Sequence, residues 1–346
     1  LMINKMDRAI AELQLEPELL FQRFNKIIQE MNALVATYGG ERYPDNYFDP
    51  VKGNVVFGAA YHGWGFSLRN FAEMYSKINN MEHHKIMKRL WGEYFISTDG
   101  KWSKSPTPGS KRGFVKLILD PIYMVYGIKT NNSPVPPILA KMNKLGVTLT
   151  KKDLDDKTND EILCAIMRNW LPAGDSVLEM VIQFLPSPKK AQLYRGKDLY
   201  TGELDSEIGQ AIINCDPEGP MTMFVSKMFP ANDNKFYAFG RVFSGTIRAG
   251  QKVKIMGGNY EYGGKTDLVQ NKNIQGVVMM MAKTVEKMDE VPCGNIVGLI
   301  GIDQYMIKSG TLSDADAHPI RPMSYSVSPV VRVAVETKNV KDIHKL

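Results

Sequence analysis

The hydrophobic pattern of the chain changes near residues 186–194, and this change limits the folds that the sequence allows. Before it, apolar residues recur at helical spacing over long stretches such as 9–38 and 174–185. Pro186 and Pro188 then end the helical pattern, and from about residue 194 short β-rich runs separated by glycines take over. The sequence therefore predicts a multidomain chain, with an α/β part followed by a β part.

Five runs in the second part have the length and composition of β-strands. They are residues 221–227, 235–247, 252–256, 275–281 and 296–301. Short strands at near-regular spacing with glycine turns are typical of a closed β-barrel. Within them, residues 236–253 are expected to form a strand and a hairpin, with Gly245 and Gly250 at turn or bulge positions.

The chain begins with the sequence LMINKMD. Residues 1–3 are apolar without alternation, as at the end of a buried parallel strand, where ligands bind in open α/β sheets. The Asp7 carboxylate can accept two hydrogen bonds from guanine, from N1–H and the 2-amino group. Asn4 can brace the loop, and the Lys5 stem can lie along the base plane. The alternative is an ordinary strand-to-helix turn in which Asn4 or Asp7 caps the next helix.

The segments after this motif complete only half of an α/β nucleotide-binding domain. The helix predicted at 9–38 is expected to restart at Pro17; a short buried strand follows at 54–57 and a turn at 58–64. The phosphate-loop pattern GxxxxGK[ST] does not occur in the sequence. We therefore expect the phosphate-binding half to precede residue 1.

Helical patterns and one polar stretch fill the rest of the first part. The patterns cover 66–100 and 114–175, and the polar stretch 97–113 is expected to be an exposed loop.

Composition excludes several classes of protein. The three cysteines are far apart and in no CxxC arrangement, which favours a reducing cytosol and opposes a zinc ribbon or a disulfide framework. No apolar run reaches the length of a membrane span, and the N-terminus has no signal-peptide pattern. A net charge of +6 permits an RNA partner without requiring one.

Several histidines and basic residues could have either a structural or a binding role. His62 is expected to pack structurally, and His83-His84 to lie on a solvated face rather than to bind metal. Four basic residues in the β part could face ribosomal RNA or form a solvated strand face: Arg241, Arg248, Lys252 and Lys254.

Several longer segments resemble one family in the same order along the chain. They include NKMD, FGAAYHGWGFSLRNFAEMY, MRNWLPAGDSVLEM, FYAFGRVFSGTIRAGQKVKIMGGNY, VPCGNIVGLIGIDQY and SVSPVVRVAVE. Over nearly all 346 residues the sequence resembles the eukaryotic elongation factor 2 family of translational GTPases. The resemblance implies an internal fragment of a cytoplasmic, monomeric GTPase that moves tRNA and mRNA through the ribosome.

The resemblance also implies which residues bind the nucleotide. The first base-contacting motif would be Asn4, Lys5 and Asp7. The second would be Ala59, Ala60 and Tyr61, where the family usually has Ser-Gly-Leu, with a backbone N–H directed to guanine O6. GTP and Mg²⁺ are the implied cofactors, and GTP/GDP and the ribosome, both RNA and proteins, are the implied partners. The phosphate loop, the switch segments with the Mg²⁺ ligands and the catalytic histidine are expected upstream, so this chain would hold no catalytic residue.

The implied domains divide the chain into five parts. They are the C-terminal part of a GTPase domain (1–65), an inserted subdomain (66–173), a return helix of the GTPase domain (174–190), a β-barrel domain (191–326) and the start of an α+β domain (327–346). Two alternatives remain open: a related GTPase of ribosome maturation or splicing, and a non-hydrolysing ribosome- or RNA-binding module in which NKMD is structural.

Overall fold

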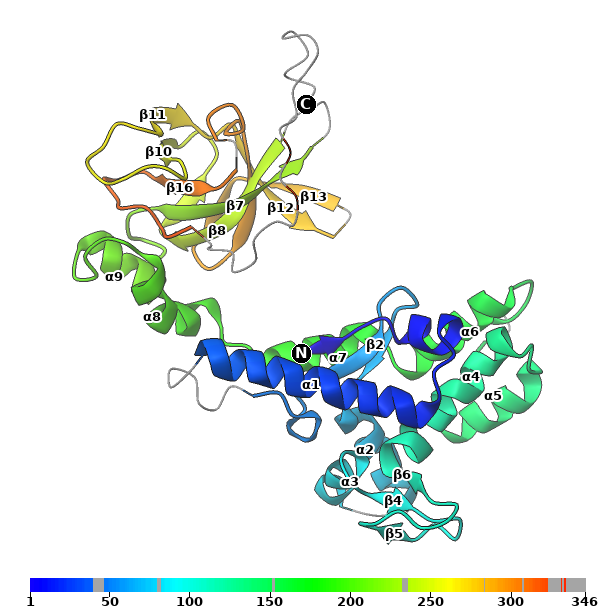
Figure 1. Ribbon diagram of the computed structural model, residues 1–346. Helices are drawn as coiled ribbons and strands as arrows, with labels where there is room; N and C mark the ends of the chain where they lie inside the picture. The colour runs from blue at the N-terminus through cyan, green and yellow to red at the C-terminus, as the bar shows by residue number, and fades with distance from the viewer. Residues whose placement is uncertain are drawn as a thin grey trace. The chain divides into compact units, whose positions relative to one another are not determined.

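The chain forms two compact units, Leu1–Leu185 and Pro186–Leu346, which are shown in Figure 1. The computed structural model describes residues 1–39, 47–79, 82–150, 153–231, 236–282, 284–306, 308–322, 331 and 333. The domain predicted at 327–346 therefore lies outside the described residues, apart from Val331 and Val333. Among the described residues, no helix is long and apolar enough to cross a membrane.

The first unit mixes helices with short strands. Its strands are β1 (Met2–Ile3), β2 (Val56–Ala59), β3 (Trp64–Phe66), β4 (Phe95–Ile96), β5 (Trp102–Ser103) and β6 (Lys111–Arg112). Its helices are η1 (Arg8–Glu12), α1 (Pro17–Gly39), η3 (Pro50–Lys52), α2 (Leu68–Asn79), α3 (His83–Leu90), η4 (Val115–Leu119), α4 (Asp120–Thr130), α5 (Val135–Lys144), α6 (Asn159–Trp170) and α7 (Ala173–Phe184). These bounds confirm the predicted restart at Pro17 and the predicted helical patterns after residue 114.

A small sheet in the order β1-β2-β3 carries the N-terminal motif. Strand β1 runs parallel to β2, and β3 returns antiparallel to β2. The turn predicted at 58–64 is thus too long, because β2 continues to Ala59 and β3 begins at Trp64. A strand of three residues has no periodicity by which the sequence could reveal it.

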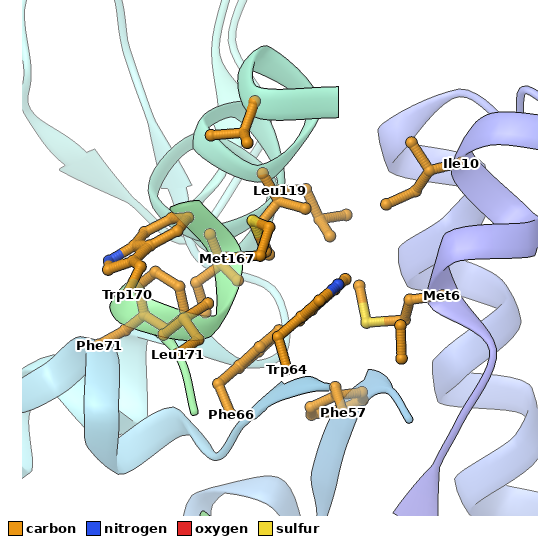
Figure 2. Packing of buried hydrophobic residues seen from close by; sticks show 14 of the residues in the cluster. Met6, Ile10, Phe57, Trp64, Phe66, Phe71, Leu119, Met167, Trp170 and Leu171 are labelled. Carbon is orange, nitrogen blue, oxygen red and sulfur yellow. The ribbon is translucent and has the colours of Figure 1, made fainter. Parts of the chain in front are cut away.

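Aromatic side chains form the core beneath this sheet. The Phe57 side chain is fully buried, and four ring centroids lie 5.1–5.7 Å from its own: those of Phe24, Phe66, Trp91 and Phe114. Figure 2 shows Met6 and Ile10 of the N-terminal segment facing Trp64 and Phe57 across the same core. The motif at the start of the chain is therefore attached to the largest apolar cluster of the first unit.

The predicted exposed loop at 97–113 contains structure that the sequence does not reveal. Strands β5 and β6 pair with β4, and the Arg112 side chain is only 8% exposed. Its guanidinium pairs with Glu18 at 3.0 Å and Glu93 at 2.9 Å, and it lies 4.3 Å from the Phe21 ring centroid. A buried guanidinium needs such partners, and Glu18 is 94 residues away in sequence.

The second unit begins with two helices and continues with strands. The helices are α8 (Pro188–Leu199) and α9 (Glu207–Asn214). The strands are β7 (Thr222–Pro230), β8 (Phe236–Ser244), β9 (Thr246–Arg248), β10 (Lys252–Met256), β11 (Leu268–Asn273), β12 (Gly276–Met281), β13 (Thr284–Met288), β14 (Glu290–Pro292), β15 (Ile296–Ile300) and β16 (Gly310–Ser313). All five predicted strand runs are confirmed, whereas the β pattern expected from residue 194 gives way to α8 and α9. Helix α8 was missed because it is mostly polar and has no clear run of apolar residues at helical spacing.

The strands of the second unit enclose one apolar core. Eight of them follow the order β11-β10-β16-β7-β8-β15-β12-β13, and β9 pairs separately with β14. Ile247 of β9 and Val291 of β14 belong to the same buried cluster as the larger sheet. The predicted hairpin at 236–253 is wrong, because β8 pairs with β7 and β15 but not with β10. Gly245 and Gly250 do have the positive φ angles, 67° and 81°, that turn or bulge positions favour.

Replacing Phe57 tests the aromatic core. Phe57→Ala should lower the free energy of unfolding of the first unit by about 3–5 kcal/mol, because it removes a buried ring and leaves a cavity. Urea denaturation followed by tryptophan fluorescence measures this. The control is Tyr38→Ala in α1, where the side chain is 77% exposed and the change should stay within about 0.5 kcal/mol. If Phe57→Ala and Tyr38→Ala lowered the free energy of unfolding equally, Phe57 would not be a major contributor to the core.

Candidate guanine-binding site

The NKMD motif connects the end of β1 to helix η1. Its third residue, Met6, is only 1% exposed and packs in the aromatic core, whereas Asn4 and Lys5 are exposed. Burial of one apolar side chain thus fixes the loop and leaves its polar neighbours outside. Met6 is thus the anchor of the motif.

Asn4 links the two turns that the sequence predicts to contact the base. Its Oδ1 accepts hydrogen bonds from the Lys5 N–H at 2.7 Å and from the Ala60 N–H at 2.9 Å. Because β1 and β2 are parallel neighbours, both turns lie at the carboxyl edge of the sheet. Lys5 has a φ of 67°, a left-handed conformation that costs energy for a residue with a Cβ. The bond from its own N–H to Asn4 supports this conformation.

Asp7 has a carboxylate that the helix does not use. It precedes η1 with helical backbone angles, and its side chain makes no capping hydrogen bond. The side chain is half-buried. Burial lowers the pKa of His62 and raises that of Tyr126, and the negative charge of Asp7 acts on both groups as a smaller, raising influence. The alternative in which Asp7 caps the following helix therefore finds no support in the described geometry.

The turn at Ala59, Ala60 and Tyr61 was expected to direct a backbone N–H to guanine O6, and not every N–H in it is available. Ala59 is fully buried in β2 opposite Trp64, and the Ala60 N–H is already bonded to Asn4. In the described part of the chain, the Tyr61 N–H has no hydrogen-bond partner, and its side chain is 86% exposed. Among Ala59, Ala60 and Tyr61, the available donor is thus the N–H of Tyr61 rather than that of Ala60.

A buried hydrogen-bond network behind the turn is invisible in the sequence. His62 is 6% exposed; its Nδ1 lies 3.0 Å from the Tyr126 hydroxyl, which also accepts from Trp64 Nε1 at 3.1 Å. Arg168 donates from Nε to the His62 carbonyl at 2.7 Å. A Cβ on Gly63, which has a φ of 76°, would lie 2.8 Å from that same Nε. These contacts confirm the structural role predicted for His62. The partners of His62 are 64 and 106 residues away.

The four basic residues proposed to face RNA lie on three different strands, β8, β9 and β10. The four residues in question are Arg241, Arg248, Lys252 and Lys254. Arg248 pairs with Glu290 at 2.8 Å and Lys254 with Asp316 at 2.9 Å, so both charges are already compensated. Arg241 lies on β8, which β7 and β16 separate from β10. Both alternatives for this set, contact with RNA and a solvated strand face, therefore stay predictions.

The described part of the chain contains no cluster of potential metal ligands. Within it, no group of three or more His, Cys, Asp or Glu side chains could hold a metal ion. His84 lies near Glu82 at 3.4 Å and is 74% exposed, as expected for the solvated face predicted for both histidines. His83 does not fit that prediction, because it is half-buried and its Nε2 is buried with no hydrogen-bond partner among the described residues.

The link between the two turns can be tested through amide hydrogen exchange. Asn4→Ala removes the acceptor of the Ala60 and Lys5 N–H groups, so both should exchange about fivefold faster or more, as expected for loss of about 1 kcal/mol. Asn4→Asp keeps an acceptor oxygen and should retain the protection. Exchange measured by NMR on the labelled chain checks this.

An internal reference for that experiment is the Arg248 N–H of the second unit, which donates to Gln251 Oε1 at 3.0 Å. Its exchange should not change in either variant. Identical Ala60 exchange in the unsubstituted chain and in Asn4→Ala would show that the link contributes nothing.

The buried imidazole predicts a pH dependence of stability. Burial lowers the pKa of His62 below its usual 6.5, with the nearby Asp7 acting in the opposite direction. As the pH falls through 6.5, the unfolded chain takes up the proton more readily than the folded one, so the free energy of unfolding decreases. His62→Asn should reduce the stability lost between pH 7.5 and 5.5, measured by urea denaturation at each pH.

The matched control is His84→Asn, which removes an exposed histidine and leaves the Tyr126 contact intact. It should keep the pH dependence of the unsubstituted chain. A pH dependence unchanged by His62→Asn would mean that another group causes it.

Comparison with protein families finds a match for part of the second unit. Residues 235–313 match the family model described as Elongation factor Tu domain 2. The match spans the strands from β8 to β16 and agrees with the glycine-punctuated β pattern of the sequence. Domain 2 of this type is a β-barrel domain of translation GTPases, and its presence in this chain supports a translation elongation factor-like GTPase.

Proposed function

We propose that residues 1–65 recognise the guanine base of GTP through Asn4, Lys5, Asp7, Ala59, Ala60 and Tyr61. The observation that carries this proposal is the hydrogen bond of 2.9 Å from the Ala60 N–H to Asn4 Oδ1. It joins two turns, 56 residues apart in sequence, at the carboxyl edge of parallel strands. Ligands of open α/β sheets bind at that edge.

Four residues of the site have separate roles in the proposal. The Asp7 carboxylate is half-buried and unused by the helix, so it is suited to the two N–H donors on one edge of guanine. Asn4 holds the two turns together, and the exposed Lys5 offers an aliphatic stem to the base plane. The Tyr61 N–H is the donor that remains for guanine O6. Adenine lacks both the N1–H donor and this oxygen.

The chain is proposed to act within a longer protein. Its sequence contains no GxxxxGK[ST] loop, and its described residues form no metal-ligand cluster, so neither phosphates nor Mg²⁺ would be held by the part described. In such GTPases Mg²⁺ neutralises charge that develops on the phosphates during hydrolysis. We assign no catalytic residue to this chain, and its part in the reaction is to select and orient the base.

The resemblance to eukaryotic elongation factor 2 supports a specific cellular role for that longer protein. We propose that it hydrolyses GTP on the ribosome in the cytoplasm and drives translocation of tRNA and mRNA. The domain 2 match supports a translation factor and is equally compatible with other members of the translation GTPases. The upstream and downstream sequences would separate translocation from ribosome maturation, splicing and non-hydrolysing RNA binding.

Substitution of Asp7 tests guanine recognition. Phosphate contacts supply much of the affinity of such sites, so the test uses the longer protein that includes the phosphate loop. Asp7→Asn places an amide donor against a guanine N–H. Since charge-assisted hydrogen bonds are worth roughly 1.5–3 kcal/mol and an unpaired buried group adds a penalty, GTP affinity should fall on the order of a hundredfold. Xanthosine triphosphate has an oxygen in place of the 2-amino group of guanine. This oxygen can accept a hydrogen bond from the new amide, so xanthosine triphosphate should become the preferred nucleotide. Equilibrium titration of both nucleotides measures this.

The matched control is Asp155→Asn, an exposed carboxylate in a turn outside the motif. It should leave both affinities unchanged. If Asp7→Asn bound GTP as tightly as the unsubstituted protein, the guanine assignment of NKMD would be wrong.

A further inference from the structure

Two of the three cysteines meet in the second unit, although 78 residues separate them in sequence. The Cys215 and Cys293 Sγ atoms lie 3.5 Å apart, and both residues are free thiols. Cys215 follows the last residue of α9, and Cys293 lies in the turn between β14 and β15. Both side chains are partly exposed, so a small solute can reach them.

Backbone hydrogen bonds hold the two cysteines in position through one shared residue. The Gly245 N–H donates to the carbonyl of Asp216, next to Cys215, at 2.7 Å. The Cys293 N–H donates to the Gly245 carbonyl at 2.9 Å. A Cβ on Gly294 would lie 3.3 Å from Cys215 Sγ, so glycine at this position leaves room for the sulfur.

This arrangement places the sulfurs close to bonding distance. A disulfide bond is about 2.05 Å long, so the sulfurs must approach by about 1.5 Å from the 3.5 Å observed. Rotation about a Cα–Cβ bond can move a sulfur by that much. Cys164, the third thiol, lies on α6 of the first unit.

We infer that Cys215 and Cys293 form a modification site, at which a peroxide joins them in a reversible intrachain disulfide. The inference rests on the second unit alone and does not depend on guanine recognition. A cytosol keeps thiols reduced, so the disulfide would mark exposure to oxidant and would be reversed by exchange with a thiol such as glutathione.

The reaction takes place in two balanced steps. Burial, followed by the hydrogen bond with Cys215, raises the pKa of Cys293 to about 12, so Cys293 holds its proton near neutral pH. We assign the first attack to Cys215: its sulfur takes one peroxide oxygen, the O–O bond breaks, and a sulfenic acid and water form. Cys293 then attacks that sulfur; its proton and the departing hydroxide form a second water. Two electrons pass from the two thiols to one peroxide.

The disulfide would tie the end of α9 to the turn between β14 and β15. Closing a loop of this length restricts the unfolded chain, so the oxidised form should melt at a higher temperature than the reduced form. A peroxide adduct confined to one sulfur would not have this effect.

The experiment counts thiols in the chain after treatment with hydrogen peroxide. Unreacted thiols are alkylated in denaturant, and peptides are identified by mass spectrometry with and without dithiothreitol. The unsubstituted chain should lose two thiols, show one Cys215–Cys293 cross-linked peptide and recover both thiols on reduction. Cys164→Ser, which removes the thiol of the first unit, should give the same cross-link.

Two further variants separate the roles of the sulfurs. Cys293→Ser should yield no disulfide but should accumulate a sulfenic acid on Cys215, detected with dimedone. Cys215→Ser should yield neither product. The inference is overturned if the unsubstituted chain keeps all its thiols at peroxide concentrations that oxidise Cys215 in Cys293→Ser, or if the recovered cross-links join other cysteines or two chains.

Discussion

The first unit depends on the burial of β2 and β3 on both faces. Phe57 and Phe66 stack with ring centroids 5.5 Å apart, and both strands are buried throughout. The two strands approach so closely that a Cβ on Gly58 would lie 2.5 Å from the Trp64 carbonyl oxygen. Because neither strand can shift without opening this core, the turn between them has a fixed position. That turn, Ala60–Gly63, is one half of the candidate site.

Burial of Met6 fixes the other half in the same way. Its side chain enters the core beside Trp64, so the exposed Asn4 and Lys5 have little freedom to move away from the sheet edge (Figure 2). The link from Asn4 to the Ala60 N–H is then a short bridge between two positions that packing has already determined. A hydrogen bond worth about 1 kcal/mol suffices for this, since the core supplies the larger energy.

The sequence predicted those features that leave a local pattern, and missed those that depend on distant partners. The helical period of Leu20, Phe24 and Ile28 identified α1, and NKMD identified the first turn. Arg112 stands in a polar stretch and gives no sign of burial, because its partner Glu18 lies on α1. The same holds for the site: the motif supplied residue types, whereas the link from Asn4 to Ala60 and the pairing of Cys215 with Cys293 exist only in three dimensions.

Helices α4 and α6 hold the turn Ala60–Gly63 in place through His62. Arg168 of α6 holds the His62 carbonyl at 2.7 Å, and Tyr126 of α4 holds the His62 ring at 3.0 Å. Hydrogen bonds of this length weaken when the partners separate by even an ångström, so the turn and these helices move together or lose the bonds. The turn is thus restrained from the sheet side by Asn4 and from the helical side by Arg168 and Tyr126. If the turn binds guanine as proposed, a donor held in this way would lose little conformational entropy on binding, which favours selection of one base over adaptation to several.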